Sequence, residues 1–205
     1  MNLDLTHLAA IAAALGWASG LRLYAVVFLT GIAGYLGWVP LPEGLAVLQN
    51  PIVLVGSAVL ALMEFVVDKI PGLDTLWDGV HTVIRIPAGA ALAAAVFSGG
   101  GVGDSSAWAL LAALLGGTLA ATSHTAKATT RAALNTSPEP FSNIAMSLAG
   151  DAAVPATLWL AWTYPLWFFP LLAVAVVLAV VLIVVFFKFL RGLLRRFVPS
   201  GQINA

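Results

Sequence analysis

The sequence contains no cysteine and few charged residues. Without thiols the chain can form neither disulfides nor thiolate metal sites, and it has no cysteine nucleophile. Charged residues occupy 9% of the 205 positions and the formal net charge is zero, whereas about 25% is usual in soluble domains. Because no excess of basic side chains creates an attractive field for a polyanion, we expect no nucleic-acid partner.

Apolar residues, in contrast, are abundant. They make up 61% of the chain, and the mean hydropathy is +1.01. Apolar runs at 52–63, 107–121 and 166–187 approach or exceed the length that crosses a hydrocarbon core, which takes about 20 helical residues. We therefore predict an all-α, polytopic integral membrane bundle that forms one transmembrane domain over residues 1–205, with the lipid bilayer as its surroundings.

Glycine, proline and polar clusters divide this bundle into helical units. The first unit is too long for one straight crossing and contains Trp-Ala-Ser-Gly at 17–20, which predicts a broken helix or a re-entrant pair. The count is then six, or seven or eight if the first unit is divided. The predicted units are 5–37, 51–69, 74–98, 107–135, 142–163 and 166–197.

A glycine-rich loop at 99–103 lies almost at the middle of the chain, with three units on each side. This arrangement predicts an inverted three-plus-three repeat with halves at about 5–98 and 106–197, an architecture common in transporters. Segments 12–16 and 112–116 resemble each other, and Glu64 corresponds roughly to Asp151.

The basic residues set the expected orientation. If each of six units crosses once, both termini lie on the cytoplasmic side, as the positive-inside rule requires. Acidic Glu43 and Asp104 fall on the opposite side. The basic residues on the cytoplasmic side are Lys69, Lys127, Arg131, Lys188, Arg191, Arg195 and Arg196.

Charged residues also recur at helical spacing inside the predicted units. Each charge in hydrocarbon costs about 2.5–3.5 kcal/mol on insertion scales, so charges kept there are neutralised internally or used. Arg22 in the first unit is a further member of this group. The candidate residues of a solute or ion pathway are Glu64, Asp68, Asp78, His81, Arg85, His124, Lys127, Arg131, Asn143 and Asp151.

The chemistry of these residues leaves several interpretations open. Glu64, Asp68, Asp78 and His81 are candidate ligands of a divalent cation, and we expect no other cofactor. The interleaved cations, Arg85 among them, would repel a metal ion and suit a small anion, with acids and histidines relaying protons.

Two non-transport interpretations also remain. An intramembrane enzyme acting on a lipid would need a nucleophile and a base, for which Ser123 beside His124, or Ser147 near Asp151, are candidates by composition. No catalytic residue is assigned. Alternatively, the charges are ion pairs that fix helix packing, with the residues near predicted helix ends acting as interfacial anchors. The latter are Lys69, Asp74, Lys127 and the C-terminal basic residues.

Two blocks of the sequence resemble a known family. The first runs Glu-Phe-Val-Val-Asp-Lys-Ile-Pro-Gly-Leu-Asp over 64–74 and continues with Trp77, Asp78 and His81. The second includes Lys127 and Arg131 and runs Asn-Thr-Ser-Pro-Glu-Pro-Phe-Ser-Asn over 135–143. These blocks resemble the bacterial membrane family described as domain of unknown function 4126. The resemblance implies a multispanning membrane protein, and we expect it in the bacterial inner membrane.

Two details refine this resemblance. Members of the family often carry an acid before the position of Asp151, where this chain has Gly150. The spacing of Glu64 and Asp68 is also similar to the Glu-x-Gly-Asp-Lys motif of small inverted-repeat manganese and calcium cation exchangers, with one residue more between the acids.

From these observations we expect a membrane transporter or channel-like permease for a small polar or ionic solute. A structural or accessory membrane protein and an intramembrane enzyme are the alternatives. Glycine at 116 and 117 and the alanine-rich faces permit close helix contact, so a homodimer is a further expectation.

Overall fold

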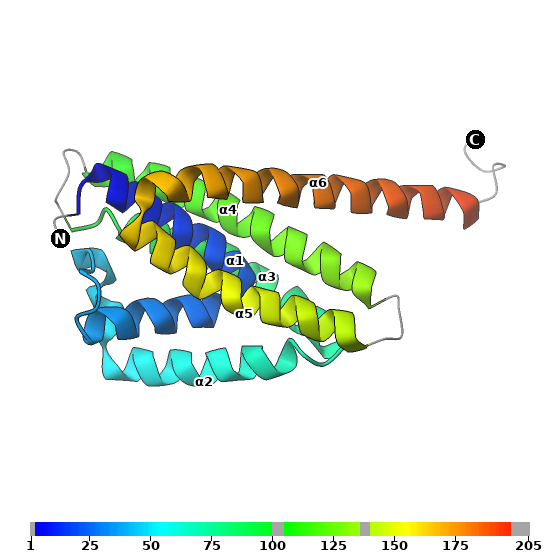
Figure 1. Cartoon of the computed structure of the whole chain (residues 1–205), viewed down its shortest axis with the longest axis horizontal. Helices are drawn as coiled ribbons and strands as arrows, with labels where there is room; N and C mark the ends of the chain where they lie inside the picture. The colour runs from blue at the N-terminus through cyan, green and yellow to red at the C-terminus, as the bar shows by residue number, and fades with distance from the viewer. Residues whose placement is uncertain (1–2, 100–104, 136–139, 198–205) are drawn as a thin grey trace.

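The computed structural model describes residues 3–99, 105–135 and 140–197, and every regular element in those ranges is a helix. Figure 1 shows the bundle that they form. Residues 100–103 of the predicted glycine-rich loop and the charge of Asp104 lie outside the described residues, as do the side chains of Arg195 and Arg196. The helices are α1 (Leu5–Tyr35), η1 (Glu43–Gln49), α2 (Pro51–Val67), α3 (Leu73–Ala95), α4 (Ser105–Leu134), α5 (Pro140–Thr163) and α6 (Pro165–Phe197).

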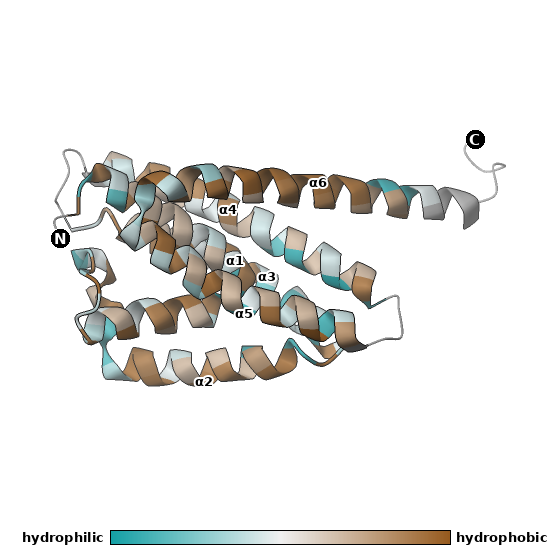
Figure 2. Cartoon of the chain, viewed as in Figure 1, coloured by the Kyte–Doolittle hydropathy of each residue, from teal (hydrophilic) through white to brown (hydrophobic). Residues whose placement is uncertain are grey.

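The described residues thus form seven helices where the simplest count from the sequence was six units. The additional element is η1, a short 3-10 helix that the sequence pattern did not distinguish from a loop. Four of the described helices are long and apolar enough to cross a membrane, or five if η1 and α2, which meet at 70°, count as one span. Figure 2 shows that α6 is hydrophobic along most of its length. These features fit an integral membrane protein.

Short polar side chains mark where the first two long helices begin. The Asp4 carboxylate accepts a hydrogen bond from the backbone N–H of His7 at 2.9 Å, which holds the pKa of Asp4 below its usual value. Asn50 caps α2 by accepting from the N–H of Ile52 at 2.9 Å, with Pro51 as the first helical residue. Both caps satisfy amide groups that have no partner within the first turn.

The helix α1 is broken at Arg22, whose backbone is extended (φ −150°, ψ 87°). The first half runs into the bundle and the second half returns toward the end where the helix began (Figure 1). In agreement with this reversal, Leu8 before the break lines the same cavity as Pro42 and Glu43 after it. The predicted division of the first unit is therefore real, and α1 has the re-entrant form. The break falls two residues beyond the predicted segment at 17–20.

Side chains of α4 support the backbone around this break. Lys127 Nζ donates to the carbonyl oxygen of Leu21 at 3.0 Å, and Ser123 Oγ donates to that of Trp17 at 2.7 Å. A helix can be interrupted at membrane depth only where neighbouring groups satisfy the freed backbone atoms. The polar face of α4 therefore stabilises the turn in α1.

The reversal of α1 changes the topology that was predicted from the sequence. The start of α1 and the end of α6 lie at opposite ends of the bundle (Figure 1). The prediction that both termini share one side assumed one crossing for the first unit, and this assumption fails at Arg22. The two halves of the chain also begin differently, because α4 is a continuous helix of 30 residues. The inverted repeat stays a prediction.

The first half of α1 packs closely against α4 through small residues. A Cβ atom at Gly16 would overlap the backbone of Gly116, and one at Gly20 would overlap Ser123 and the carbonyl of Ala120. Small residues let helix backbones approach closely inside membranes. This contact places the break in α1 directly beside the polar residues of α4.

We expect the Gly16→Ala substitution to lower the free energy of unfolding by about 1–3 kcal/mol, because the new methyl group meets backbone that cannot rotate away. Thermal unfolding in detergent micelles measures the effect. Gly56→Ala is the matched control, since a Cβ atom there has open space and alanine favours the helix. Equal losses of stability in the two variants would contradict this account of the packing.

Candidate functional site

Ten charged side chains form a connected set of ion pairs beside the break in α1. We call this set the ion-pair network. It contains five carboxylates and five cations, so its formal charge is zero. The carboxylates are Glu64, Asp68, Asp74, Asp78 and Asp151, and the cations are Arg22, Lys69, Arg85, Lys127 and Arg131. Lys69 and Asp151 are about one fifth exposed, and the other eight are buried.

Asp68 is the centre of the network. It is the C-cap of α2, and its Oδ2 atom lies 3.1 Å from Arg22 Nη2, 3.0 Å from Lys127 Nζ and 3.1 Å from Arg131 Nη2. The end of α2 places this carboxylate among the cations of α1 and α4. Three cations around one buried carboxylate compensate its desolvation.

A second group of pairs runs along α3. Arg85 donates to Glu64 Oε1 at 2.5 Å through Nη2 and to Asp78 Oδ1 at 2.6 Å through Nη1. Asp78 is seven residues before Arg85, two helical turns away on the same face. Lys127 Nζ also lies 3.1 Å from Asp78 Oδ1, which links this group to Asp68.

The remaining pairs close the network at its edges. Arg131 Nη1 donates to Asp74 Oδ2 at 3.1 Å, and Asn135 Nδ2 donates to Asp74 Oδ1 at 3.0 Å. On the other side, Asp151 pairs with Arg22 at 3.0 Å and with Lys69 at 3.0 Å. The network therefore joins α1, α3, α4 and α5 with the segment at the end of α2.

The structure brings most of the predicted pathway residues into this network. His124 lies beside it, because its Nδ1 accepts from Arg85 Nη1 at 3.2 Å and its Nε2 lies 2.8 Å from Thr82 Oγ1. The predicted residues that are members are Glu64, Asp68, Asp78, Arg85, Lys127, Arg131 and Asp151.

His81 and Asn143 are not brought into the network by a hydrogen bond or ion pair within the described residues. His81 stacks on Trp77 with ring centroids 4.0 Å apart. Its Nδ1 donates to the Trp77 carbonyl at 2.8 Å, and its Nε2 lies 3.1 Å from the Tyr24 hydroxyl. Asn143 is buried, and its amide group has no hydrogen bond within the described part of the chain.

The proposed metal ligands do not form a coordinating group. Glu64, Asp68 and Asp78 face guanidinium and ammonium groups, whereas His81 faces Trp77 and Tyr24. Among the residues that the structure describes, no group of three or more histidine or acidic side chains is placed to hold a metal ion. The arrangement of the four residues gives the divalent-cation interpretation no support.

The candidate nucleophiles are also engaged elsewhere. Ser123 Oγ donates to the Trp17 carbonyl, while the ring of the adjacent His124 faces Thr82 and Arg85. Ser147 Oγ accepts from Arg22 Nη2 at 3.0 Å and from Lys69 Nζ at 3.3 Å. Neither serine is paired with a base by these contacts, so the geometry gives the enzyme interpretation no support.

One member of the network was left out of the predicted pathway. Asp74 was interpreted as an interfacial residue near a helix end, but it is buried and ion-paired. The available signal for Asp74 was its position four residues before Asp78, on the same helical face. Arg22 was the one charged residue within the first predicted unit, and it turns out to mark the break in α1.

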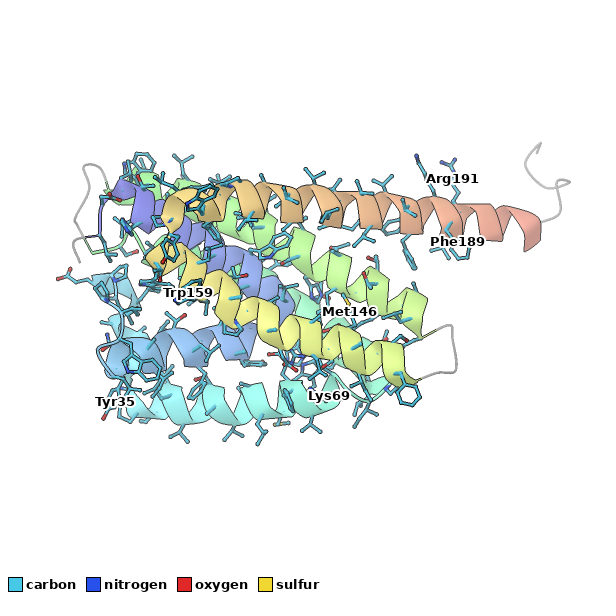
Figure 3. All side chains as sticks on the ribbon, in the orientation of Figure 1. Tyr35, Lys69, Met146, Trp159, Phe189 and Arg191 are labelled. Atoms are coloured by element: carbon cyan, nitrogen blue, oxygen red, sulfur yellow. The ribbon has the colours of Figure 1, made fainter. Side chains whose placement is uncertain are left out.

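A cavity of about 270 Å³ adjoins the network. We call it the cationic cavity. Arg22, Asp68, Lys127 and Arg131 reach it from the network, and its other sides come from α1, α4, α5 and α6. Met146 of α5 lies at this space, between α4 and α5 (Figure 3).

These features define a class, an α-helical membrane protein with a charge-paired interior beside a broken helix. The model of the family described as "Domain of unknown function (DUF4126)" matches residues 9–185, so the chain belongs to that family. The comparisons with curated proteins and with solved structures found no match.

Proposed function

We propose that the protein is a transporter or channel-like permease for a small polar or ionic solute, and that the ion-pair network forms its pathway. The observation that carries the proposal is the position of the network at the break in α1. In many transporters a discontinuous helix exposes backbone and charged groups at the solute site. Ionisable residues inside a membrane bundle are costly and therefore indicate function.

The balance of charges suggests how a solute would be admitted. Each cation of the network is already paired, so an incoming anion or polar group takes the place of a carboxylate at one of them. Asp68 is the natural group to be displaced, because three cations share its Oδ2 atom and each has a further partner. The exchange keeps every buried cation neutralised.

The basic residues support one orientation for this permease. The C-terminal ends of α2 and α4 lie toward the end of the bundle at which α6 ends, while η1 lies at the other end (Figure 1). Lys69 directly follows α2, Lys127 and Arg131 belong to the last turns of α4, and Glu43 begins η1. Under the positive-inside rule the end of α6 is cytoplasmic, and the start of α1 is on the opposite face. The bacterial inner membrane is the location that we propose.

The proposal is tested by reconstituting the full chain into vesicles and recording currents on a solid-supported membrane after concentration jumps. Chloride, inorganic phosphate and the fatty-acid anion dodecanoate serve as anionic probes, and potassium as a cationic probe. We expect a protein-dependent current for at least one anion, since cations line the cavity. Currents equal to those of protein-free vesicles for every probe would contradict the proposal.

The structural alternative keeps one observation in its favour. The network is balanced in charge and closed by its own pairs, which is also what a device for fixing helix packing would need. A variant in which one positive and one negative charge are removed together distinguishes the two functions. A scaffold needs only the balance, whereas a permease needs the particular groups that face the solute.

We also propose that His124 couples transport to protons. In the observed arrangement His124 Nδ1 accepts a hydrogen bond from Arg85. Protonation at Nδ1 would break this contact and place two cations next to each other. The repulsion would weaken the contacts of Arg85 with Asp78 and Glu64. Transport rates in vesicles should therefore change as the pH is lowered and Nδ1 takes up a proton. A rate that ignored pH, and that survived both His81→Ala and His124→Ala, would rule this coupling out.

A further inference from the structure

The polar floor of the cationic cavity carries an excess of positive charge. Arg22, Lys127 and Arg131 line it together with one carboxylate, Asp68. The other carboxylates that hold these cations, Asp74, Asp78 and Asp151, approach them from outside the lining. The charged side chains that a molecule inside the cavity meets are therefore mainly cationic, although the whole network is neutral.

One buried donor at this floor has no acceptor within the described residues. Arg22 Nη1 forms no hydrogen bond there, and Arg22 is 2% exposed. Arg131 Nε also forms no hydrogen bond, but it faces Asp78 Oδ2 at 3.7 Å. A buried donor of a charged group is costly to leave unpaired. Arg22 already uses its Nη2 group for Asp68, Asp151 and Ser147, so its other amino group is available to an anion.

The walls of the cavity have a different character. Trp17, Leu21 and Met146 are apolar, and α6 contributes Leu178 and Leu182. These two leucines are exposed on the outer surface of the bundle, on a helix that is hydrophobic along most of its length (Figure 2). The wall of the cavity thus continues into the surface that would face lipid tails.

Gly150 keeps the space opposite Arg22 open. It lines the cavity, and a Cβ atom at this position would lie 3.6 Å from Arg22 Nε, an ordinary contact distance. A longer side chain here would extend into the cavity beside the guanidinium group. The absence of a side chain at position 150 therefore leaves room for an external anion at Arg22.

We propose that the cationic cavity binds the anionic headgroup, a carboxylate or a phosphate, of an amphiphile whose apolar chain lies along α6. Arg22, Arg131 and Lys127 would bind the headgroup, as such cations bind carboxylates and phosphates elsewhere. The volume of about 270 Å³ lies just below the range of about 300–1,000 Å³ that encloses whole ligands. The chain of the amphiphile would therefore leave the cavity. This inference names the solute class of the proposed permease and in that respect rests on it.

The experiment measures binding, without transport. The full chain in nanodiscs of phosphatidylcholine is incubated with radiolabelled dodecanoate, and retention above that of empty nanodiscs is recorded. We expect saturable binding that dodecyl phosphate displaces. Dodecyltrimethylammonium has the same chain and the opposite charge, and acetate and inorganic phosphate carry the charge without the chain, so none of these should displace dodecanoate.

The competitors distinguish binding of the anionic headgroup with its chain from binding of the apolar chain alone or of a free anion. Displacement by dodecyltrimethylammonium as effective as that by dodecyl phosphate would mean that the chain alone is recognised, which overturns the proposal. Displacement by acetate or inorganic phosphate at similar concentrations would mean that a free anion suffices, and this also overturns it. Absence of saturable dodecanoate binding would also overturn the proposal.

Variants at position 150 locate the site. Gly150→Asp places a carboxylate beside Arg22 and should weaken dodecanoate binding about tenfold or more. Gly150→Asn takes up a similar volume without charge, so it should weaken binding much less. Equal effects of the two variants would show that only space matters and would contradict a cationic site.

The binding readout also separates this inference from the proposed function. Saturable dodecanoate binding that Gly150→Asp removes, together with vesicle currents equal to those of empty vesicles, would leave the ligand class standing and remove the permease. Anion currents without dodecanoate binding would keep the permease and overturn the amphiphile.

Discussion

Replacing Asp68 by asparagine is expected to lower the free energy of unfolding by about 3–5 kcal/mol, the range observed when one partner of a buried ion pair is removed. The Oδ2 atom of Asp68 lies within 3.1 Å of nitrogen atoms of Arg22, Lys127 and Arg131, and its side chain is fully buried. Asparagine keeps the shape but leaves the interior with one positive charge in excess.

Unfolding in mixed micelles of increasing dodecyl sulfate content, followed by tryptophan fluorescence, measures this loss. Asp151→Asn is the matched control, because it also removes a carboxylate that pairs with Arg22 but is about one fifth exposed. Its effect should be near 1 kcal/mol or less, as for exposed pairs. Similar losses in both variants would mean that burial of the network does not govern stability.

Restoring the charge balance should recover part of this stability. In the double variant Asp68→Asn with Lys127→Met, one negative and one positive charge are removed together. Arg22 keeps Asp151 as a partner, and Arg131 keeps Asp74. The double variant should therefore be more stable than Asp68→Asn alone, since no buried charge is left in excess.

Replacing Arg131 by lysine is expected to reduce the vesicle current about tenfold or more while the protein remains folded. Arg131 reaches Asp68 through Nη2 and Asp74 through Nη1, both at 3.1 Å, and its Nε lies 3.7 Å from Asp78. Lysine keeps the charge but provides a single nitrogen, which cannot span these carboxylates. The geometry of the floor of the cationic cavity is lost although the charge balance is kept.

The comparison variant is Arg191→Lys. Arg191 is exposed on α6, away from the network (Figure 3), so the current should be unchanged. Size-exclusion chromatography and the unfolding transition confirm that both proteins are folded. If Arg131→Lys carried the same current as the unaltered protein, Arg131 would have no part in the pathway.

Much of the fold follows from the sequence because hydrophobic length determines membrane helices. Each of the six predicted units overlaps one α-helix, with ends that differ by a few residues. The pairing of opposite charges on α3 and α4 was also foreseeable, since Asp78, Arg85, Lys127 and Arg131 recur at helical spacing in apolar surroundings.

The reversal of α1 could be anticipated only as an alternative. The length of the first unit indicated a break, but the extended backbone at Arg22 depends on groups contributed by α4, a hundred residues later in the chain. Contacts of this kind are tertiary, so no local pattern reveals them. The prediction that both termini lie on one side assumed a single crossing of the first unit, and it stays a prediction.

The roles of the histidines could not be read from spacing either. His81 belongs to the same helical stripe as Asp78 and Arg85, yet its ring turns toward Trp77 and Tyr24. Spacing specifies a face of a helix, whereas the partner of a ring depends on its rotamer and on the neighbouring helix.

The measurement that tests the central claim most directly is the anion current of the charge-balanced double variant, Asp68→Asn with Lys127→Met, in vesicles where its folding has been verified. If the buried groups conduct the solute, the current should fall about tenfold or more even though balance and folding are restored. A folded double variant with the current of the unaltered protein would show that these charges serve only to hold the helices together.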